Sequence, residues 1–280
     1  MTINNWRRSV NQTTGTHTST LLSTCINSKV KPYPAPIDVF YTETKDIISK
    51  FAPQDFLTCD WLGSYLSLGI FSSTENYFRE IFSEIISICP CAQKTSASSP
   101  INLGSVIWHP VGDIARGAFE HLSFADSDMI FKSARNYIGI ELKIPQFVKI
   151  FEEFDKICEL RHGIVHSSRI IAGKNAIKLG LNSSKDKSYI TIGYSELQDI
   201  MAVCNNLVTT INTFLFEKIS HRWAIDWRTF PSWSITDEHI NFKKIWTIFY
   251  SSIDSGHGTI PSKLTLMKCK NMIKSEYGLA

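Results

Sequence analysis

Residues 74–88 read TENYFREIFSEIISI, and this stretch decides the fold class. Apolar side chains recur in it at spacings of three and four residues, which places them on one face of an α-helix. These side chains belong to Tyr77, Phe78, Ile81, Phe82 and Ile85. The segment extends back to Trp61, and Pro90 ends it because proline cannot continue a helix. We therefore expect a long helix over residues 61–88 whose apolar face packs against a core.

Further segments have the spacing and boundary residues of helices, and they span residues 127–138, 145–161, 195–215 and 237–250. Asp126 or Ser127 supplies the N-cap of the first. Pro145 suits the first turn of the second. Ser195 and Gln198 form a capping box at the start of the third. The sequence therefore predicts a bundle of amphipathic helices.

Two segments depart from the helical pattern. Apolar and polar side chains alternate over residues 177–181, which is the pattern of a strand. Residues 189–192 follow after a polar turn and could form the second strand, so we expect a small hairpin. Residues 92–104 are rich in Ser, Ala and Lys and are expected to form a loop. The predicted fold class is all-α, a helical bundle with a small hairpin insertion.

Composition divides the chain into three parts. Residues 1–35 are polar, with bases and no acid, which indicates a flexible tail and loosely resembles an organellar transit peptide. Residues 36–220 form the helical domain, and residues 221–280 form a C-terminal accessory subdomain. In that subdomain Trp223, Trp227, Phe230 and Trp233 crowd together near Arg222 and Arg228. These aromatic side chains either pack in a core or partner interface, or stack the bases of a single strand.

The overall composition is that of a globular protein, with 280 residues, 43% of them hydrophobic and 20% charged. No run of about 18 apolar residues is present, so we expect a soluble protein with no membrane partner, and the cysteine pattern described next favours a cytoplasmic location. The seven cysteines lack the paired spacing of zinc ribbons or secreted disulfide scaffolds, which favours reduced thiols. Cys89 and Cys91 are the one close pair, a weak signal for metal or redox chemistry.

Charge is unevenly distributed along the chain. Residues 36–160 hold 17 acids and 10 bases, whereas residues 161–280 hold 9 acids and 15 bases. A basic half favours a polyanionic partner such as RNA. The glycine-rich loops that bind ATP or NAD are missing from the sequence, so no cofactor is expected.

The segment ELRHGIVHSSR, residues 159–169, places groups suited to phosphate chemistry at the end of an apolar helix. An imidazole such as that of His166 exchanges protons near neutral pH, and histidine is the commonest general acid or base. The guanidinium of Arg161 stays charged and offers a fork of donors to phosphate oxygens. The pair, written R-H-G-I-V-H, resembles the R-x4-H motif of the HEPN superfamily. The order of helices over about residues 60–220 is similar to that family as well.

The resemblance implies a bundle of four to five core helices, usually dimeric, that cleaves RNA without a metal ion by attack of the ribose 2′-OH. Arg161 and His166 would be the catalytic residues, and His162 would orient His166 or touch phosphate. Glu159 and Glu75 would hold the arginine or histidine in place. Such enzymes act as toxins or antiviral effectors, which implies a possible regulatory partner or antitoxin. Next to the motif, Arg169 and Lys174 are candidates for binding the RNA.

Several alternatives stay open at this stage. Positions five apart on an unbroken helix diverge by about 140°, so Arg161 and His166 need not share a face. Either Gly163 relaxes the helix, or a second subunit completes the site. His162 and His166 also have the spacing of two metal ligands on a helix, but no acid stands between them and no third ligand is evident. One alternative function is a catalytically inactive HEPN module that binds a protein or nucleic acid. In another, the segment is a helix end with ordinary ion pairs and caps.

Overall fold

The computed structural model describes residues 19, 22–26, 35–182, 186–257 and 264–279. The chain separates into two compact units, residues 1–32 and residues 33–280. Of the first unit, the described part contains a single 3-10 turn, Leu22–Cys25. Apart from Ser19, residues 22–26 and Ala35, the tail predicted at residues 1–35 lies outside the described residues.

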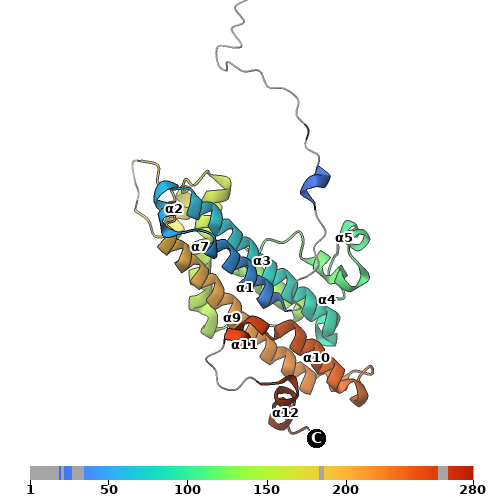
Figure 1. Cartoon of the computed structure of the whole chain (residues 1–280). Coiled ribbons are helices and arrows are strands. Elements are labelled where there is room, and N and C mark those ends of the chain that lie inside the picture. The colour runs from blue at the N-terminus through green and yellow to red at the C-terminus, as the bar shows by residue number, and fades with distance from the viewer. Residues whose placement is uncertain (1–18, 20–21, 27–34, 183–185, 258–263, 280) are drawn as a thin grey trace, which may run out of the picture. The chain divides into compact units, whose positions relative to one another are not determined.

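The second unit is built around the long helix α3 (Leu62–Ile88), as Figure 1 shows. Packed on α3 are α1 (Pro36–Ser49), α7 (Val148–His166), α9 (Tyr194–Ala224) and α10 (Glu238–Phe249). All five apolar residues that predicted α3 are at most 1% exposed: Tyr77, Phe78, Ile81, Phe82 and Ile85. The described residues form no strand, so the all-α fold class is confirmed.

Shorter helical elements connect and cover these helices. They are α2 (Pro53–Thr58), α4 (Pro90–Ser96), α5 (Leu103–Trp108), η3 (Val111–Ala118), α6 (Ser127–Ser133), η4 (Ala134–Ile138), η5 (Pro145–Phe147), α8 (Gly173–Lys178), η6 (Trp227–Thr229), η7 (Ile235–Asp237), α11 (Ser252–His257) and α12 (Leu266–Glu276). Asp126 caps α6 as predicted, because its side chain accepts a hydrogen bond of 2.7 Å from Met129 N. Pro145 lies in the turn that leads into α7, also as predicted.

The predicted hairpin is wrong. Residues 173–178 form helix α8, and the alternation that suggested a strand faces solvent, with Ile177 79% exposed. The segment expected to pair with it lies instead beside the residues that follow α7, where Ile190 N donates to Arg169 O at 2.7 Å. A bridge between Ile170 and Tyr189 completes this short contact. Alternation over a few residues was insufficient evidence, because the described residues form no sheet on which these side chains could pack.

Two boundaries also differ from the prediction. Residues 92–104 are not a continuous loop, because Pro90 begins α4 as its first residue and α4 extends to Ser96. The capping box is wrong too, since α9 begins at Tyr194 with Gly193 as its N-cap. Ile192 is buried and lies against Gly63, so the chain enters the helix directly after this contact and before Ser195.

The C-terminal residues extend the bundle. Helix α9 runs through residue 220 to Ala224, and α10 and α12 pack on it. Trp223 and Trp227 are buried in the core, so they pack there and offer no surface for stacking bases. Helix α10 confirms the prediction for residues 237–250. Searching the described helices for a bilayer-spanning segment finds none of sufficient length and apolarity.

Candidate functional site

The predicted motif lies in the last two turns of α7. The helix is unbroken from Val148 to His166, so Gly163 does not relax it. Gly163 instead allows close packing, because a Cβ atom there would lie 2.6 Å from Ile190 Cδ1 and 3.3 Å from Ile170 O. The 140° divergence between Arg161 and His166 is therefore retained.

Arg161 is held by a buried carboxylate. Its Nη2 lies 3.3 Å from Glu75 Oε1 on α3, and the Arg161 side chain is 26% exposed. Glu75 Oε2 also accepts from Arg79 Nη2 at 2.9 Å and from the backbone N–H of Phe124 at 3.2 Å. Glu75 thus bridges two guanidinium groups and fixes the position of Arg161, 86 residues away in the sequence.

His162 and His166 form an exposed pair of imidazoles. Their ring centroids are 4.7 Å apart, with the rings tilted by 50°. Both side chains are exposed, and the described part of the chain supplies no hydrogen-bond partner to either ring. Within one chain the structure therefore brings His162 and His166 together, whereas Arg161 is directed to α3.

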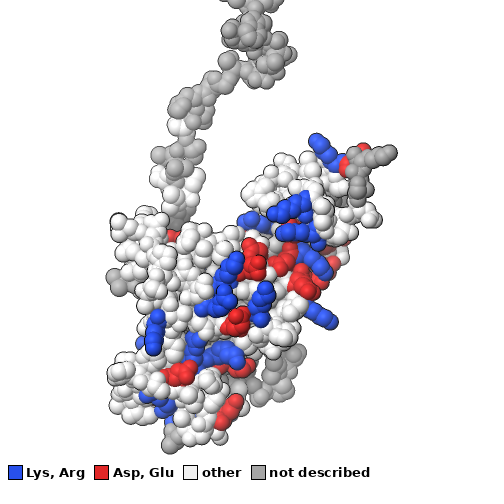
Figure 2. Space-filling view, turned by 180° about the vertical axis from the view of Figure 1, so that it is seen from behind, with Lys and Arg blue, Asp and Glu red and all other residues white. Residues whose placement is uncertain are grey.

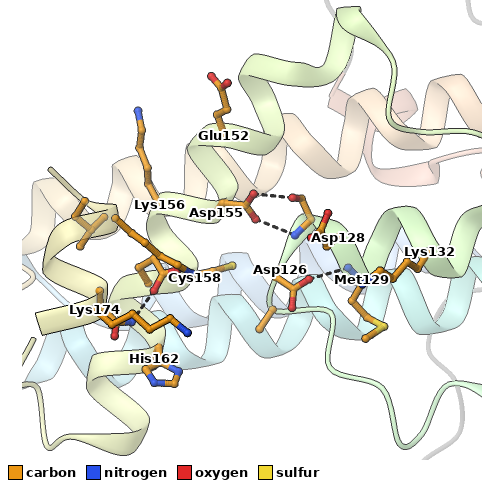
Figure 3. Close-up of a pocket in the computed structure, with 16 residues that line it drawn as sticks. Asp126, Asp128, Met129, Lys132, Glu152, Asp155, Lys156, Cys158, His162 and Lys174 are labelled. Atoms are coloured by element: carbon orange, nitrogen blue, oxygen red, sulfur yellow. Dashed lines mark hydrogen bonds and ion pairs between the residues drawn. The ribbon is translucent and has the colours of Figure 1, made fainter. Parts of the chain in front are cut away.

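A pocket of about 830 Å³ lies between α6, α7 and α8, and His162 is at its edge (Figure 3). Glu159 lines it but contacts neither Arg161 nor His166, because its carboxylate accepts from Asn175 Nδ2 at 2.6 Å and pairs with Lys178. Lys174 also lines this pocket and is exposed. Acidic and basic residues are mixed in its wall, and they are intermixed across the face of the molecule that Figure 2 shows.

Arg169 lies just after α7, where the backbone turns through two positive φ angles. Ser168 and Arg169 have φ angles of 47° and 70°, in the left-handed region that side chains other than glycine seldom adopt. Such strain costs roughly 1–3 kcal/mol per residue and recurs at functional sites. Arg169 Nη1 donates to Asp60 O at 3.1 Å and lies 3.2 Å from Asp60 Oδ2. The motif is thereby tied to the start of α3.

The thiol of Cys89 lies among groups that favour its thiolate form, which its spacing from Cys91 did not establish. It is buried at the start of α4, with Arg222 Nη1 4.0 Å from its Sγ. A hydrogen bond from Cys91, another from the N–H of Ala92 and the charge of Arg222 lower the pKa of Cys89 to about 6, although burial opposes this shift. Arg222, 133 residues distant in the sequence, could not be placed there from the spacing alone.

A thiolate should therefore form at low pH. We expect the ultraviolet absorbance of the protein to rise with a midpoint near pH 6 as Cys89 ionises. The Cys89→Ser variant should lose this step. Cys204→Ser should keep it, because burial raises the pKa of Cys204 to about 12. An unchanged titration in Cys89→Ser would contradict the assignment.

The alternative interpretation takes His162 and His166 as two metal ligands on α7, and the part of the chain that the structure describes places no third ligand with them. Among the described residues, no group of three or more His, Cys, Asp or Glu side chains is placed to hold an ion. Comparison with known proteins finds no matching family, no similar curated protein and no similar solved structure.

Proposed function

We propose that this chain is an endoribonuclease of the HEPN type that cleaves RNA without a metal ion and acts as a homodimer. The observation that carries the proposal is the pair of exposed imidazoles, His162 and His166, with ring centroids 4.7 Å apart. The same helix carries Arg161, which the buried carboxylate of Glu75 holds. Acid and base catalysis by two imidazoles needs no bound ion.

The chemistry assigns one proton to each imidazole. A neutral imidazole takes the proton of the ribose 2′-OH, and the 2′-oxygen attacks the adjacent phosphorus. The bond from phosphorus to the 5′-oxygen breaks, and a protonated imidazole gives its proton to that leaving oxygen. The products are a 2′,3′-cyclic phosphate and a 5′-hydroxyl. A guanidinium beside the phosphate offsets the charge that builds on its oxygens.

A second subunit is part of this proposal because Arg161 and His166 diverge on an unbroken helix. In a two-fold dimer the same patch meets itself, so Arg161 of one chain can reach a phosphate held by the histidines of the other. Arg161 Nη2 has the contact with Glu75, and the remaining guanidinium nitrogens of Arg161 have no hydrogen bond to any described residue. They are free to bind a phosphate.

The test is cleavage of mixed RNA in the presence of EDTA. We expect His166→Ala to lower the rate about 10²- to 10⁴-fold, since a general acid or base contributes that much. Arg161→Ala should also abolish cleavage, whereas His239→Ala, a change of an exposed histidine on α10, should leave the rate unchanged. Equal rates for His166→Ala and His239→Ala would exclude the proposal.

Mixing the two inactive variants tests the shared site. If each site takes its arginine from one chain and its histidine from the other, a mixed dimer of Arg161→Ala and His166→Ala has one intact site. Random mixing should then restore about a quarter of the wild-type rate. RNA that is bound but never cut would favour the inactive binding module. Growth arrest on expression, relieved by His166→Ala, would support a role as a toxin or antiviral effector.

A further inference from the structure

We propose that Cys89 and Cys91 form a reversible oxidation site, in which a peroxide converts the two thiols into a disulfide. This inference does not depend on RNA cleavage. Both residues lie at the start of α4, where Cys89 is the N-cap and Cys91 follows after Pro90. Cys91 donates a hydrogen bond to the sulfur of Cys89, so the two sulfur atoms already face each other. A disulfide forms only between side chains directed toward one another in this way.

Donors from three helical elements surround the sulfur of Cys89 and favour its thiolate. Arg222 Nη1 on α9 lies 4.0 Å from Cys89 Sγ, and the N–H of Ala92 donates to it from within α4. Trp227 in η6 also favours the thiolate, and its buried Nε1 has no other hydrogen-bond partner among the described residues. A thiolate stabilised in this way beside a second thiol is the arrangement of a redox-sensitive cysteine.

The two sulfur atoms differ in exposure, which assigns a role to each. Cys89 is 0% exposed, whereas Cys91 is partly exposed. The oxidant therefore meets Cys91, and Cys89 supplies the buried nucleophile that attacks the oxidised sulfur. Cys158 and Cys204 are also close enough to interact, but both are buried, and burial raises the pKa of both thiols. These two cysteines are the control pair, because they should stay as thiols.

The reaction needs only hydrogen peroxide and the two thiols. At neutral pH the two sulfur atoms share one proton, since the first of the two has already ionised. When that proton lies on Cys89, the Cys91 thiolate attacks one oxygen of the peroxide, the O–O bond breaks, hydroxide leaves, and Cys91 becomes a sulfenic acid. Cys89 then attacks the Cys91 sulfur, the S–O bond breaks, and the hydroxyl group leaves as water with the proton of Cys89. The two sulfur atoms have lost two electrons to the peroxide, and a thiol reductant returns them.

The test is treatment of the reduced protein with hydrogen peroxide, followed by N-ethylmaleimide to block the remaining thiols. Trypsin cuts after Arg79 and Lys94, so residues 80–94 form one peptide that contains both cysteines. In mass spectrometry this peptide should carry no maleimide and be lighter by two hydrogen atoms than its reduced form, and dithiothreitol should reverse the change. Peptides from the control pair should keep their maleimide groups. The oxidation rate should rise with a midpoint near pH 6, well below the value of about 8.5 for a free cysteine.

Variants assign the two roles. Cys89→Ser and Cys91→Ser should form no disulfide in this peptide, whereas Cys269→Ser, a change on α12, should oxidise like the wild type. In Cys89→Ser the sulfenic acid of Cys91 has no partner, so dimedone should label residue 91. A wild-type peptide that keeps both maleimide groups after peroxide overturns the proposal. Loss of the thiols of the control pair at the same rate overturns it too, because such oxidation would reflect unfolding of the chain. Both of these outcomes are measured on the wild-type protein and do not require that a variant folds.

Discussion

Replacing Glu75 by alanine is expected to lower the free energy of unfolding by about 3–5 kcal/mol, the usual cost of removing one partner from a buried ion pair. The carboxylate is 9% exposed and binds Arg161 and Arg79, so its loss leaves two largely buried guanidinium groups without their anion. It also removes the acceptor of the Phe124 N–H. Urea unfolding of the two proteins measures the difference.

A matched control exists on α7. Glu153 pairs with Lys156 at 2.6 Å, but both side chains are more than half exposed. Exposed pairs contribute about 0–1 kcal/mol, so Glu153→Ala should unfold almost like the wild type. If Glu75→Ala were as mild as Glu153→Ala, the buried network would not hold Arg161 in the way described. Glu75→Gln keeps the shape of the side chain and should fall between the two.

The second large effect is expected for Gly63→Ala. A Cβ atom at this position of α3 would lie 2.0 Å from the carbonyl oxygen of Ile192 and 2.8 Å from its carbonyl carbon. Because both neighbours are backbone atoms, the segment that leads into α9 must shift. We expect a loss of about 3 kcal/mol in the free energy of unfolding, at the upper end for overpacking.

Alanine substitutions at two other glycines serve as controls for Gly63→Ala. At Gly69 the added atom would meet the flexible end of Ile47, 2.7 Å from Cδ1, and at Gly173 it would meet nothing within 4 Å. Alanine favours helices by about 1 kcal/mol over glycine, so these two substitutions should be mild or stabilising. In thermal unfolding, the melting temperature of Gly63→Ala should therefore be far below those of the other two variants. Similar melting temperatures for Gly63→Ala and Gly173→Ala would refute the close approach of α3 to Ile192.

The sequence predicted helices well where one face had to be buried. The spacing of Tyr77, Phe78 and Ile81 required a buried stripe, and α3 has one. The hairpin prediction was wrong because the alternating side chains of Ile177 and Leu181 are exposed, and the part of the chain that the structure describes has no sheet for them to pack on. Alternation indicates a strand only where a second element packs on one side.

The sequence named residues of the candidate site, but it did not show which side chains those residues contact. The resemblance singled out Glu75 as a carboxylate for the motif, and the structure places it on Arg161. It also singled out Glu159, whose carboxylate contacts α8 instead. Helix α8 was not expected, so no sequence argument could supply the partner of Glu159.

Asp38, near the start of α1, has implications for the order of assembly during synthesis. Its buried carboxylate accepts hydrogen bonds from the hydroxyl and the N–H of Ser252 and from the hydroxyl of Ser251, 213 residues later in the chain. The donors that this acid has in the folded protein are therefore missing until residues 251 and 252 have been synthesised. Helix α1 can pack on α3 before this segment exists, but its buried carboxylate receives these hydrogen bonds only once Ser251 and Ser252 have folded onto it.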